Sequence, residues 1–502
     1  MTWLVAVPVV LPLVGAAVSI LAGRSRVAQR TVGVVVLATT TAIAVVLLVH
    51  VDRSGPVVAH AGGWPARIGI ALVADRFAAL MLVVASVTLL AVLVYAIGEP
   101  GAERNHVGFQ SVYLVLAAGV ALAFLTGDLF DLFVAFEMML TASYVLLTLG
   151  GRREQMRSGT TYVVLSLLSS TLFVTAVALL YSATGTVNMA VLAQRIHTLP
   201  SGTASAFAAL LVVVFGIKAA LFPFFFWLPD SYPIAPSPIT AVFAGLLTKV
   251  GIYALIRTQT LLFPAGSRPG TLLLVLAGAT MVIGVAGAIA QDDVKRILSF
   301  DIVSQVGYMV MGLGFFTVAG VAAAVFYMVQ HIVVKTSLFM TAGLVEHAAG
   351  TGELPRLRGL LRTAPVLAVL FLLSALSLAG VPPLSGFVGK LALVEAGFQS
   401  HAAAIVAVSL AVSLLTLSVM ARIWSGAFWG AAGEPAEPDG GEEAVARVGR
   451  LGGPVWMVVP TGALVACGVA AALAAGPLYG LSVRTAHDLM EPARYVHAVV
   501  GR

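Results

Sequence analysis

Apolar runs long enough to cross a bilayer recur along almost the whole chain, with short polar or glycine-rich stretches between them. A transmembrane helix needs about 20 predominantly apolar residues, so each such run predicts one membrane span. The longest loops between the runs are too short to form a soluble domain. We therefore expect an all-α polytopic membrane protein of about 14 transmembrane helices. The predicted spans lie near residues 3–22, 31–50, 76–98, 109–127, 129–149, 158–184, 204–228, 237–263, 271–291, 299–317, 319–345, 365–398, 402–429 and 454–481.

The amino-acid composition supports this class and excludes others. Of 502 residues, 60% are hydrophobic and 10% are charged, which is far from the balance of a soluble globular protein. The net charge of +6 is small for this length and does not indicate a nucleic-acid partner. The single cysteine, Cys467, excludes an internal disulfide and a thiolate metal or iron–sulfur site built from this chain alone. The first apolar run lacks a basic preceding segment, so we interpret it as a retained helix and not as a cleaved signal.

Basic residues predict the orientation of the spans, because lysine and arginine are enriched in cytoplasmic loops. The odd-numbered loops contain Arg24, Arg26, Arg30, Arg104, Arg152, Arg153, Arg157, Lys295, Arg296, Arg356, Arg358, Arg362, Arg447 and Arg450. The even-numbered loops contain only Arg53, Arg67, Arg195 and Arg268, with Arg76 and Arg257 at span ends. We expect the odd loops, including an acidic loop at 430–453, to face the cytoplasm and both termini to face outward.

Two predicted spans are interrupted by proline, which removes a backbone donor and breaks or kinks a helix. Span seven contains Lys218 and then a break at 223–229, whereas span twelve contains a break at 380–386 and then Lys390. The breaks lie five spans apart, and an odd offset reverses the direction of the chain. This spacing predicts inverted five-helix repeats with broken helices 7 and 12, a plan that recurs in transporters. The predicted parts are an N-terminal three-helix segment (1–108), a first repeat (109–263), a second repeat (271–429), and the acidic cytoplasmic loop with a C-terminal helix (430–502).

Three charged residues of the first half, Glu137, Lys218 and Lys249, lie inside predicted spans. A charged side chain costs about 2.5–3.5 kcal/mol at the membrane centre on insertion scales, so these residues are expected to have a use. A desolvated lysine can lose its proton and a nearby carboxylate favours keeping it, whereas a guanidinium does not deprotonate. A glutamate and a lysine together are therefore suited to proton transfer. The alternatives are a structural ion pair for Glu137 and lysines that extend to the membrane surface.

The second half contains three further titratable residues, His331, Lys335 and Lys390. His331 and Lys335 are four residues apart and share one helix face, and histidine titrates near neutral pH, so the two can pass a proton along the helix. The alternative for His331 is a core histidine that is satisfied by its neighbours. Lys390 is a candidate for the exit-side proton site, with Glu395 as a competing structural partner.

Other polar residues are assigned weaker roles. Ser304, Gln305 and Tyr308 either order water in span ten or pack helices together. Five aspartates lie near predicted span ends, and most of them are expected to be helix caps or interface residues, namely Asp75, Asp128, Asp131, Asp230 and Asp301. The sequence has no GxxxxGK[ST] motif, no GxGxxG in a βαβ setting and no pair of histidines at haem or metal spacing along a span. We therefore expect no cofactor, no metal, no redox centre and no hydrolytic site.

Four segments resemble the antiporter-like subunits shared by complex I and the Mrp-type multisubunit Na+/H+ antiporters. They are TGDLFDLFVAFEMML around Glu137, residues 215–251 with both lysines, DDVKRILSFDIVSQVGYMVMG, and LSLAGVPPLSGFVGKLALVEAG around Lys390. The resemblance covers nearly the whole chain. It implies fourteen core helices, inverted repeats and a mid-membrane axis of polar residues. On that axis it implies Glu137 and Lys218 as the first pair, Lys249 as the central link, His331 and Lys335 as the next relay, and Lys390 as the terminal site.

The chain is most similar to the Mrp branch in three respects. Its length is close to that of the bare core, the segments HAGGWPARIGIALVADRFAAL and EPARYVHAVVG are Mrp-like, and span twelve carries a lysine. This implies a proton-translocating subunit of a monovalent cation (Na+)/H+ antiporter, with other membrane subunits, H+, monovalent cations and the lipid bilayer as partners. The alternatives are a proton-pumping subunit of complex I or of a membrane hydrogenase, and a non-conducting scaffold.

Overall fold

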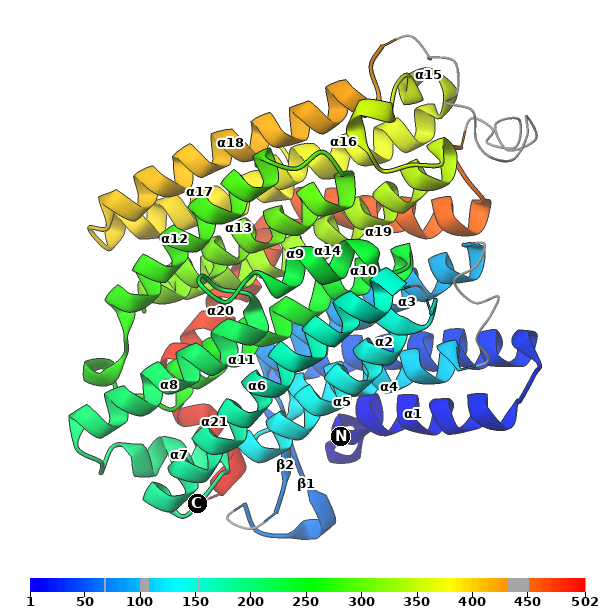
Figure 1. Cartoon of the computed structure of the whole chain (residues 1–502). Coiled ribbons are helices and arrows are strands. Elements are labelled where there is room, and N and C mark those ends of the chain that lie inside the picture. The colour runs from blue at the N-terminus through cyan, green and yellow to red at the C-terminus, as the bar shows by residue number, and fades with distance from the viewer. Residues whose placement is uncertain (67–68, 100–107, 152, 431–450, 502) are drawn as a thin grey trace.

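The computed structural model is a bundle of long helices lying side by side, and it describes residues 1–66, 69–99, 108–151, 153–430 and 451–501 (Figure 1). The helices are α1 (Thr2–Leu21), α2 (Arg26–Ser54), α3 (Arg76–Gly98), α4 (Phe109–Leu125), α5 (Leu129–Thr148), α6 (Arg153–Thr184), α7 (Met189–Ile196), α8 (Ser201–Ala219), α9 (Trp227–Ser231), α10 (Ser237–Val242), α11 (Thr248–Leu261), α12 (Gly270–Ile289), α13 (Val294–Gly314), α14 (Val318–Ala349), α15 (Leu360–Thr363), α16 (Pro365–Ala379), α17 (Ser385–Gln399), α18 (Ala403–Ala427), α19 (Val455–Leu473), α20 (Ala475–Met490) and α21 (Ala493–Val500).

The long helices confirm the prediction of an all-α polytopic membrane protein. Twelve helical segments in the described part of the chain are long and apolar enough to cross a membrane, and α4 and α16 are shorter apolar helices. The segments differ in their surroundings. The span formed by α10 and α11 is fully enclosed by other helices, and α13 and α14 are largely enclosed, whereas only 33% of the residues in the apolar windows of α2 and α6 are buried. The enclosed helices are the ones that can hold charged groups away from lipid.

Both predicted helix breaks are present, and they have the same backbone geometry. Helix α8 ends at Ala219, and Ala220 adopts the left-handed conformation with φ 59°. The N–H of Leu221 then donates to the carbonyl of Gly216 at 2.9 Å. Helix α16 ends in the same way, with Gly380 at φ 85° and the N–H of Val381 donating to Leu376 at 3.0 Å. Each break therefore ends a helix with a closed turn that redirects the chain.

The span that follows the first break contains a second irregularity. Residues Phe243–Leu247 form a π-helical turn between α10 and α11. Such a turn shifts the hydrogen-bond register by one residue and occurs frequently at functional sites. Lys249 lies in the first turn of α11, directly after this irregularity.

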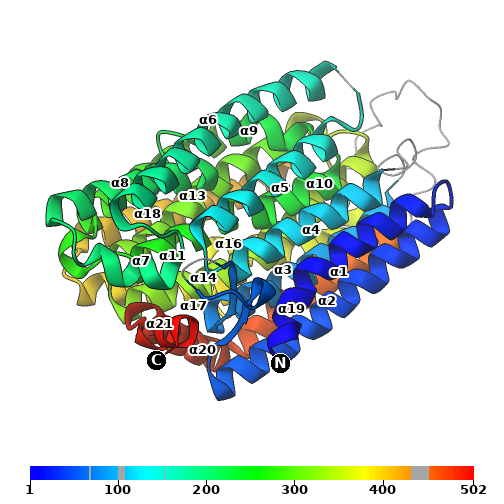
Figure 2. The same ribbon diagram turned by 90° about the horizontal axis from the view of Figure 1, so that it is seen from below.

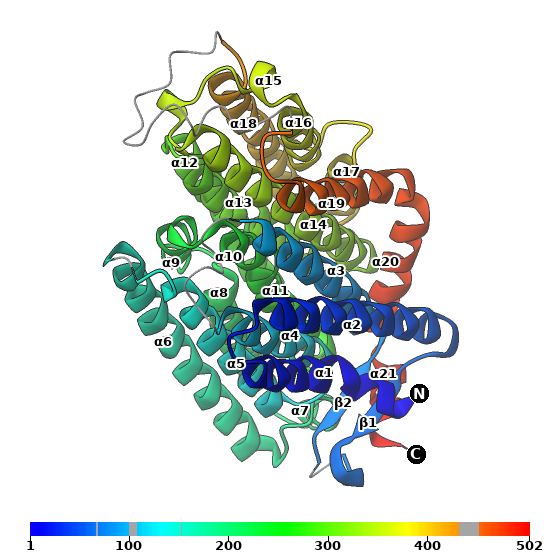
Figure 3. The ribbon, with the colours of Figure 1, turned by 90° about the vertical axis from the view of Figure 1, so that its right-hand side faces the viewer.

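Three additions to the predicted spans were not expected from the sequence: a hairpin, a short helix and an extension of the last span. Strands β1 (Val57–His60) and β2 (Ala71–Ala74) form an antiparallel hairpin in the loop at 50–75. The short helix α7 follows α6, and the last span continues past α19 into α20 and α21. Figures 2 and 3 show both chain termini near this hairpin, so these additions gather at one end of the bundle. Most of the acidic loop at 430–453, together with Arg67, Arg104, Arg152, Arg447 and Arg450, lies outside the described residues.

A buried ion pair fixes this end of the bundle. Asp75 caps the N-terminus of α3, and its two oxygens accept hydrogen bonds from the guanidinium of Arg257 in α11 at 2.6 and 2.7 Å. Both side chains are buried, and the guanidinium also lies against the rings of Phe77, Tyr253 and Tyr495. The expectation that Asp75 is a cap is confirmed. Its second role is to join α3, α11 and α21.

We expect Asp75→Asn to lower the free energy of unfolding by about 3–5 kcal/mol, because it leaves a buried guanidinium without its carboxylate. Thermal unfolding of the purified complex in detergent measures the loss. Asp230→Asn is the matched control, since Asp230 is 61% exposed and pairs with Arg296 at the surface. A surface pair contributes about 0–1 kcal/mol. Equal stability losses for the two variants would contradict the assignment.

Candidate functional site: a buried axis of acids, lysines and a histidine

The first site joins Glu137 and Lys218 through a serine. Glu137 lies in the middle of α5 and Lys218 in the last turn of α8. Ser170 of α6 lies between them, and its hydroxyl donates to Oε1 of Glu137 and accepts from Nζ of Lys218 at 3.1 Å. The predicted pair is therefore brought together, with a hydroxyl as the bridge. A hydroxyl both donates and accepts, so it can relay a proton between an acid and an amine.

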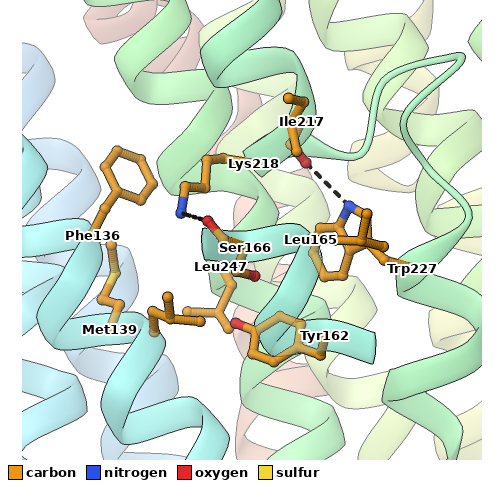
Figure 4. A pocket seen from close by; sticks show the side chains of 10 residues that line it. Phe136, Met139, Tyr162, Leu165, Ser166, Ile217, Lys218, Trp227 and Leu247 are labelled. Carbon is orange, nitrogen blue, oxygen red and sulfur yellow. Dashed lines mark hydrogen bonds between the residues drawn. The ribbon is translucent and has the colours of Figure 1, made fainter. Parts of the chain in front are cut away.

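A small cavity opens beside this pair. It measures about 40 Å³, and Phe136, Tyr162, Ser166, Lys218 and Leu247 contribute to its lining. Figure 4 shows the Lys218 ammonium pointing toward Ser166, whose carbonyl it contacts at 3.4 Å. One water molecule needs a cavity of about 10–15 Å³, so this cavity has room for at least one. The cavity also reaches from the first break toward the π-helical turn that precedes Lys249.

On the expectation of proton transfer drawn from the sequence, Ser170→Ala should lower proton-coupled transport by about tenfold while Ser170→Thr keeps most of it, because Thr retains the bridging hydroxyl. Transport rates of the assembled complex in everted vesicles measure the effect. Ser182→Ala in the same helix is the control, since that hydroxyl bonds only to the carbonyl of Leu179 on an exposed face. Wild-type transport in Ser170→Ala would show that the bridge is dispensable.

Lys249 is completely buried on the span that contains the π-helical turn. Its ammonium donates to the carbonyl of Ala244, inside that turn, at 2.5 Å. The extra residue of the turn thus provides an acceptor for a charge that would otherwise lack one. Helix α11 also approaches α8 closely, because a Cβ on Gly251 would lie 2.9 Å from the backbone nitrogen of Ala219. This close approach brings Lys249 next to the broken end of the helix that carries Lys218.

Lys335 forms an ion pair that the sequence analysis did not predict. Its ammonium lies 2.5 Å from Oδ2 of Asp301, and both side chains are almost completely buried, at 0% and 1% exposed. The prediction that Asp301 lies near a span end is wrong, because α13 begins at Val294 and Asp301 lies two turns inside it. Asp301 is the carboxylate of the second half. Its charge acts on Lys249 and Lys390 as well as on Lys335.

Two neutral side chains extend the Asp301 site. Gln305 donates to Oδ1 of Asp301 at 2.9 Å, and the hydroxyl of Tyr327 donates to Oε1 of Gln305. The ring of Tyr327 lies 5.7 Å from that of Tyr308, and the Tyr308 hydroxyl donates to the carbonyl of Ser409. The sequence left two roles open for Gln305, ordering water or packing helices together. In the structure, its amide instead donates a hydrogen bond directly to the buried carboxylate of Asp301. These contacts connect α13 and α14 toward α18.

His331 is fully buried on the same helix as Lys335. Both of its ring nitrogens lack a hydrogen-bond partner among the described residues. The charges of Lys249, Lys335 and Lys390 all act on it, and its ring faces that of Tyr327 at 6.1 Å. The alternative of a core histidine satisfied by protein neighbours is therefore not supported. A neutral imidazole has one donor and one acceptor nitrogen, so His331 has the chemistry to pass a proton on.

Lys390 follows the second break on α17. Its ammonium donates to the carbonyl of Ala379 at 3.0 Å and to the hydroxyl of Ser413 at 2.9 Å. It also lies 5.1 Å from the centre of the Tyr308 ring. The competing suggestion of a structural bond to Glu395 differs from these observed partners. Lys390 instead binds the carbonyl of the last residue of α16, next to the second break. Lys218 likewise lies in the last turn of α8, next to the first break.

The six predicted residues form two groups in the structure. Glu137 and Lys218 form the first group, while Lys249, His331, Lys335 and Lys390 gather around Asp301. The sequence analysis missed Asp301 and Ser170. The motif around Asp301 offered a signal, because an aspartate within a long apolar helix is costly unless it is paired. Ser170 offered none, since serine is common in membrane helices.

Two broken helices, each with a buried lysine beside the break, and a series of titratable groups across the bundle define an antiporter-like membrane protein. The chain belongs to the NADH:quinone oxidoreductase/Mrp antiporter transmembrane family, whose model matches residues 126–416. Within it, the chain is 44% identical over 501 residues to the D-type subunit of the Na(+)/H(+) antiporter of Alkalihalophilus pseudofirmus, with 99% of each chain covered. The resemblance predicted from the sequence motifs is thus confirmed.

Two solved structures extend the comparison to the fold. A chain of the Mrp complex from a Dietzia species superposes with a TM-score of 0.90 at 35% identity, with 100% of each chain covered. A chain of the archaeal membrane-bound sulfane sulfur reductase, a respiratory membrane complex, superposes with a TM-score of 0.88 at 29% identity, with 99% of each covered. The fold therefore occurs both in an Mrp complex and in an archaeal respiratory membrane complex.

Proposed function

We propose that this chain is a proton-translocating membrane subunit of a multisubunit monovalent cation (Na+)/H+ antiporter. The observation that carries the proposal is the series of buried titratable groups that runs from Glu137 to Lys390. The similarity to the Na(+)/H(+) antiporter protein of Alkalihalophilus pseudofirmus over nearly the whole chain supports it. A lipid-exposed or purely structural bundle has no need for four buried lysines, since each is costly to insert.

The contacts suggest how a proton moves. In the first half, a proton on Lys218 can pass through the hydroxyl of Ser170 to Glu137, or leave toward the cavity. The cavity leads toward the turn that holds Lys249. From Lys249 the next acceptors are His331 and the Lys335–Asp301 pair, and Lys390 is the last group of the series. Each lysine is held by a carbonyl, hydroxyl or carboxylate, so that its proton has an acceptor nearby.

We further propose that the two halves are inverted repeats. Asp128 caps α5 and pairs through its backbone with Asn188, and Asp293 caps α13 and pairs in the same way with Glu353. Asp128 lies at the end of the bundle where α3 begins, because the neighbouring Thr126 pairs with Leu72 of β2. Asp293, the equivalent cap in the second half, lies at the other end of the bundle, where α3 stops. Equivalent caps at opposite ends are what an inverted pair of repeats requires.

The distribution of basic residues among the loops supports a proposal for the orientation and location of the chain in the membrane. Most basic residues lie at the end of the bundle where α3 stops, so we propose that this end faces the cytoplasm and that both termini face outward in the cell membrane. The divisions at 1–108, 109–263, 271–429 and 430–502 remain our proposed parts of the chain. Variants that lack Cys467 and carry one introduced cysteine in a loop test the orientation by their reaction with a membrane-impermeant thiol reagent.

A proton-pumping subunit of a redox-driven complex is the second candidate. The observation that favours it is the 29% identity to a chain of an archaeal respiratory membrane complex. The two proposals differ in their partners. Purification of the tagged chain from native membranes should recover small hydrophobic membrane subunits in the first case, and flavin and iron–sulfur subunits in the second.

A further inference from the structure

A second serine-bridged acid and lysine lie away from the mid-membrane axis, at the end of the bundle where α3 stops. Lys295 is in the first turn of α13, and its side chain is 5% exposed. Its ammonium donates to the hydroxyl of Ser237 at 3.1 Å, at the start of α10. Ser237 in turn hydrogen-bonds to the carboxylate of Glu99, the residue that follows α3. The arrangement Glu99–Ser237–Lys295 repeats the chemistry of Glu137–Ser170–Lys218.

A second carboxylate competes for the same lysine. Oε2 of Glu346, in the last turn of α14, lies 2.6 Å from Nζ of Lys295. The Glu346 side chain is 31% exposed, so it is open to water, whereas Oε2 of Glu99 is buried with no hydrogen-bond partner among the described residues. Two acids thus share one lysine, and the cluster carries one excess negative charge when both are ionised. Binding one proton restores neutrality.

The cluster is connected by two helices to the mid-membrane axis. Helix α13 carries both Lys295 and Asp301, six residues apart, which corresponds to about 9 Å along the helix. Helix α14 carries both Lys335 and Glu346. The same two helices are therefore joined by two ion pairs, one at the membrane centre and one at its surface. The lysine of the surface pair is on α13, whereas the lysine of the central pair is on α14. This geometry places the water-facing cluster within two helical turns of the Asp301 site along α13.

We propose that Glu99, Lys295 and Glu346 form a proton-exchange site between the cytoplasmic water and the Asp301–Lys335 pair. This inference rests on the proposed function. In cation/proton antiport, protons that leave the axis pass to Glu99, then to the Lys295–Glu346 pair and to water. No bond other than to the proton changes, and each transfer regenerates the donor as the acceptor for the next proton.

The protonation behaviour of Glu99 fits this role. Burial is the main cause that raises the pKa of Glu99 to about 7, against the opposing effects of Lys295 and Ser237, and Glu346 raises it further. Tyr95 of α3 also faces the two acids, and Asp293 interacts with Lys295 from the loop before α13. The accepting carboxylate form therefore becomes populated as the pH of this face rises through about 7.

Antiport in everted vesicles containing the whole complex tests the site, because the cytoplasmic face is then the outer face and the medium sets its pH. We expect wild-type proton release to rise as the medium pH passes through about 7. Glu99→Gln should flatten this rise and lower the rate at alkaline pH by about tenfold, since it removes the accepting carboxylate. Glu353→Gln is the control, because Glu353 is 55% exposed and pairs with Arg356 on the same face.

A second variant covers the case in which Glu99→Gln does not assemble. Glu346→Gln removes the acid that raises the pKa of Glu99, so the pH profile should shift downward by about one unit. If the complex with Glu346→Gln assembles and keeps the wild-type pH profile, the inference is overturned. A higher half-saturating Na+ concentration with an unchanged pH profile would also overturn it, because it indicates a cation site. If Glu137→Gln abolishes antiport in the same assay, the proposed function stands whatever the outcome here.

Discussion

Glu137→Gln is expected to reduce Na+-dependent proton transport by about 100-fold or more, because a glutamine cannot take the proton that reaches it through Ser170. The substitution keeps the size of the side chain and its ability to accept the serine hydroxyl. The fold around α5 and α6 should therefore persist, and only the titratable group is lost. The measurement is fluorescence recovery of a pH probe after addition of Na+ to everted vesicles that contain the complete complex.

Two further variants show whether the loss belongs to the pair. Lys218→Ala should be as inactive as Glu137→Gln, and the double variant should be no worse, because each group is useless without the other. Glu154→Gln is the control, since Glu154 lies exposed in the first turn of α6. Complex assembly is followed by size-exclusion chromatography. Normal transport in an assembled Lys218→Ala variant would contradict the site assignment.

Asp301→Asn is expected to impair both stability and transport. The substitution leaves Lys335 in a fully buried position without its carboxylate, and removing one partner of a buried pair costs about 3–5 kcal/mol. It also removes the charge that acts on Lys249 and Lys390. We therefore expect a lower unfolding temperature and the loss of nearly all antiport. Asp292→Asn is the matched control, because Asp292 is 71% exposed and pairs with Arg422 at the surface.

A double substitution separates the two effects. Asp301→Leu with Lys335→Met replaces the buried pair by apolar groups of similar size, which is often neutral or stabilising. Thermal unfolding should return most of the way to that of the wild type, with about 1–3 kcal/mol still lost because the buried Gln305 amide lacks its acceptor, while antiport stays absent. Recovery of transport together with stability would mean that the pair only holds α13 and α14 together, and Asp301 would then not belong to the proton path.

The sequence predicted the spans and both breaks because lipid-exposed helices require long apolar runs and proline interrupts them. It misplaced Asp301 for a physical reason. The charged residues before Ile297 delay the apolar run, so the predicted span starts at 299, whereas α13 begins at Val294. Helix α13 is enclosed by other helices and not by lipid, so its polar residues do not mark its end. Apolar runs therefore locate lipid-facing helices better than enclosed ones.

The connections between the predicted residues also lay beyond sequence analysis. Lys218 and Glu137 were predicted as a pair, but the bridge through Ser170 that joins them depends on three helices meeting at one point. The π-helical turn that supplies the carbonyl for Lys249 has no local signal, because it arises from packing of the enclosed span. Residue types and spacing thus identified the buried titratable groups, whereas the contacts between them depend on the tertiary structure.

The most direct test of the account uses the complex purified through a tag on this chain and reconstituted in liposomes with a trapped pH probe. An imposed Na+ gradient should drive proton movement in the opposite direction, without any reductant or quinone, and Lys218→Ala should abolish it. Proton movement that requires a reductant and quinone, or Na+-driven movement that survives Lys218→Ala, would contradict the proposal that this chain carries protons for cation exchange.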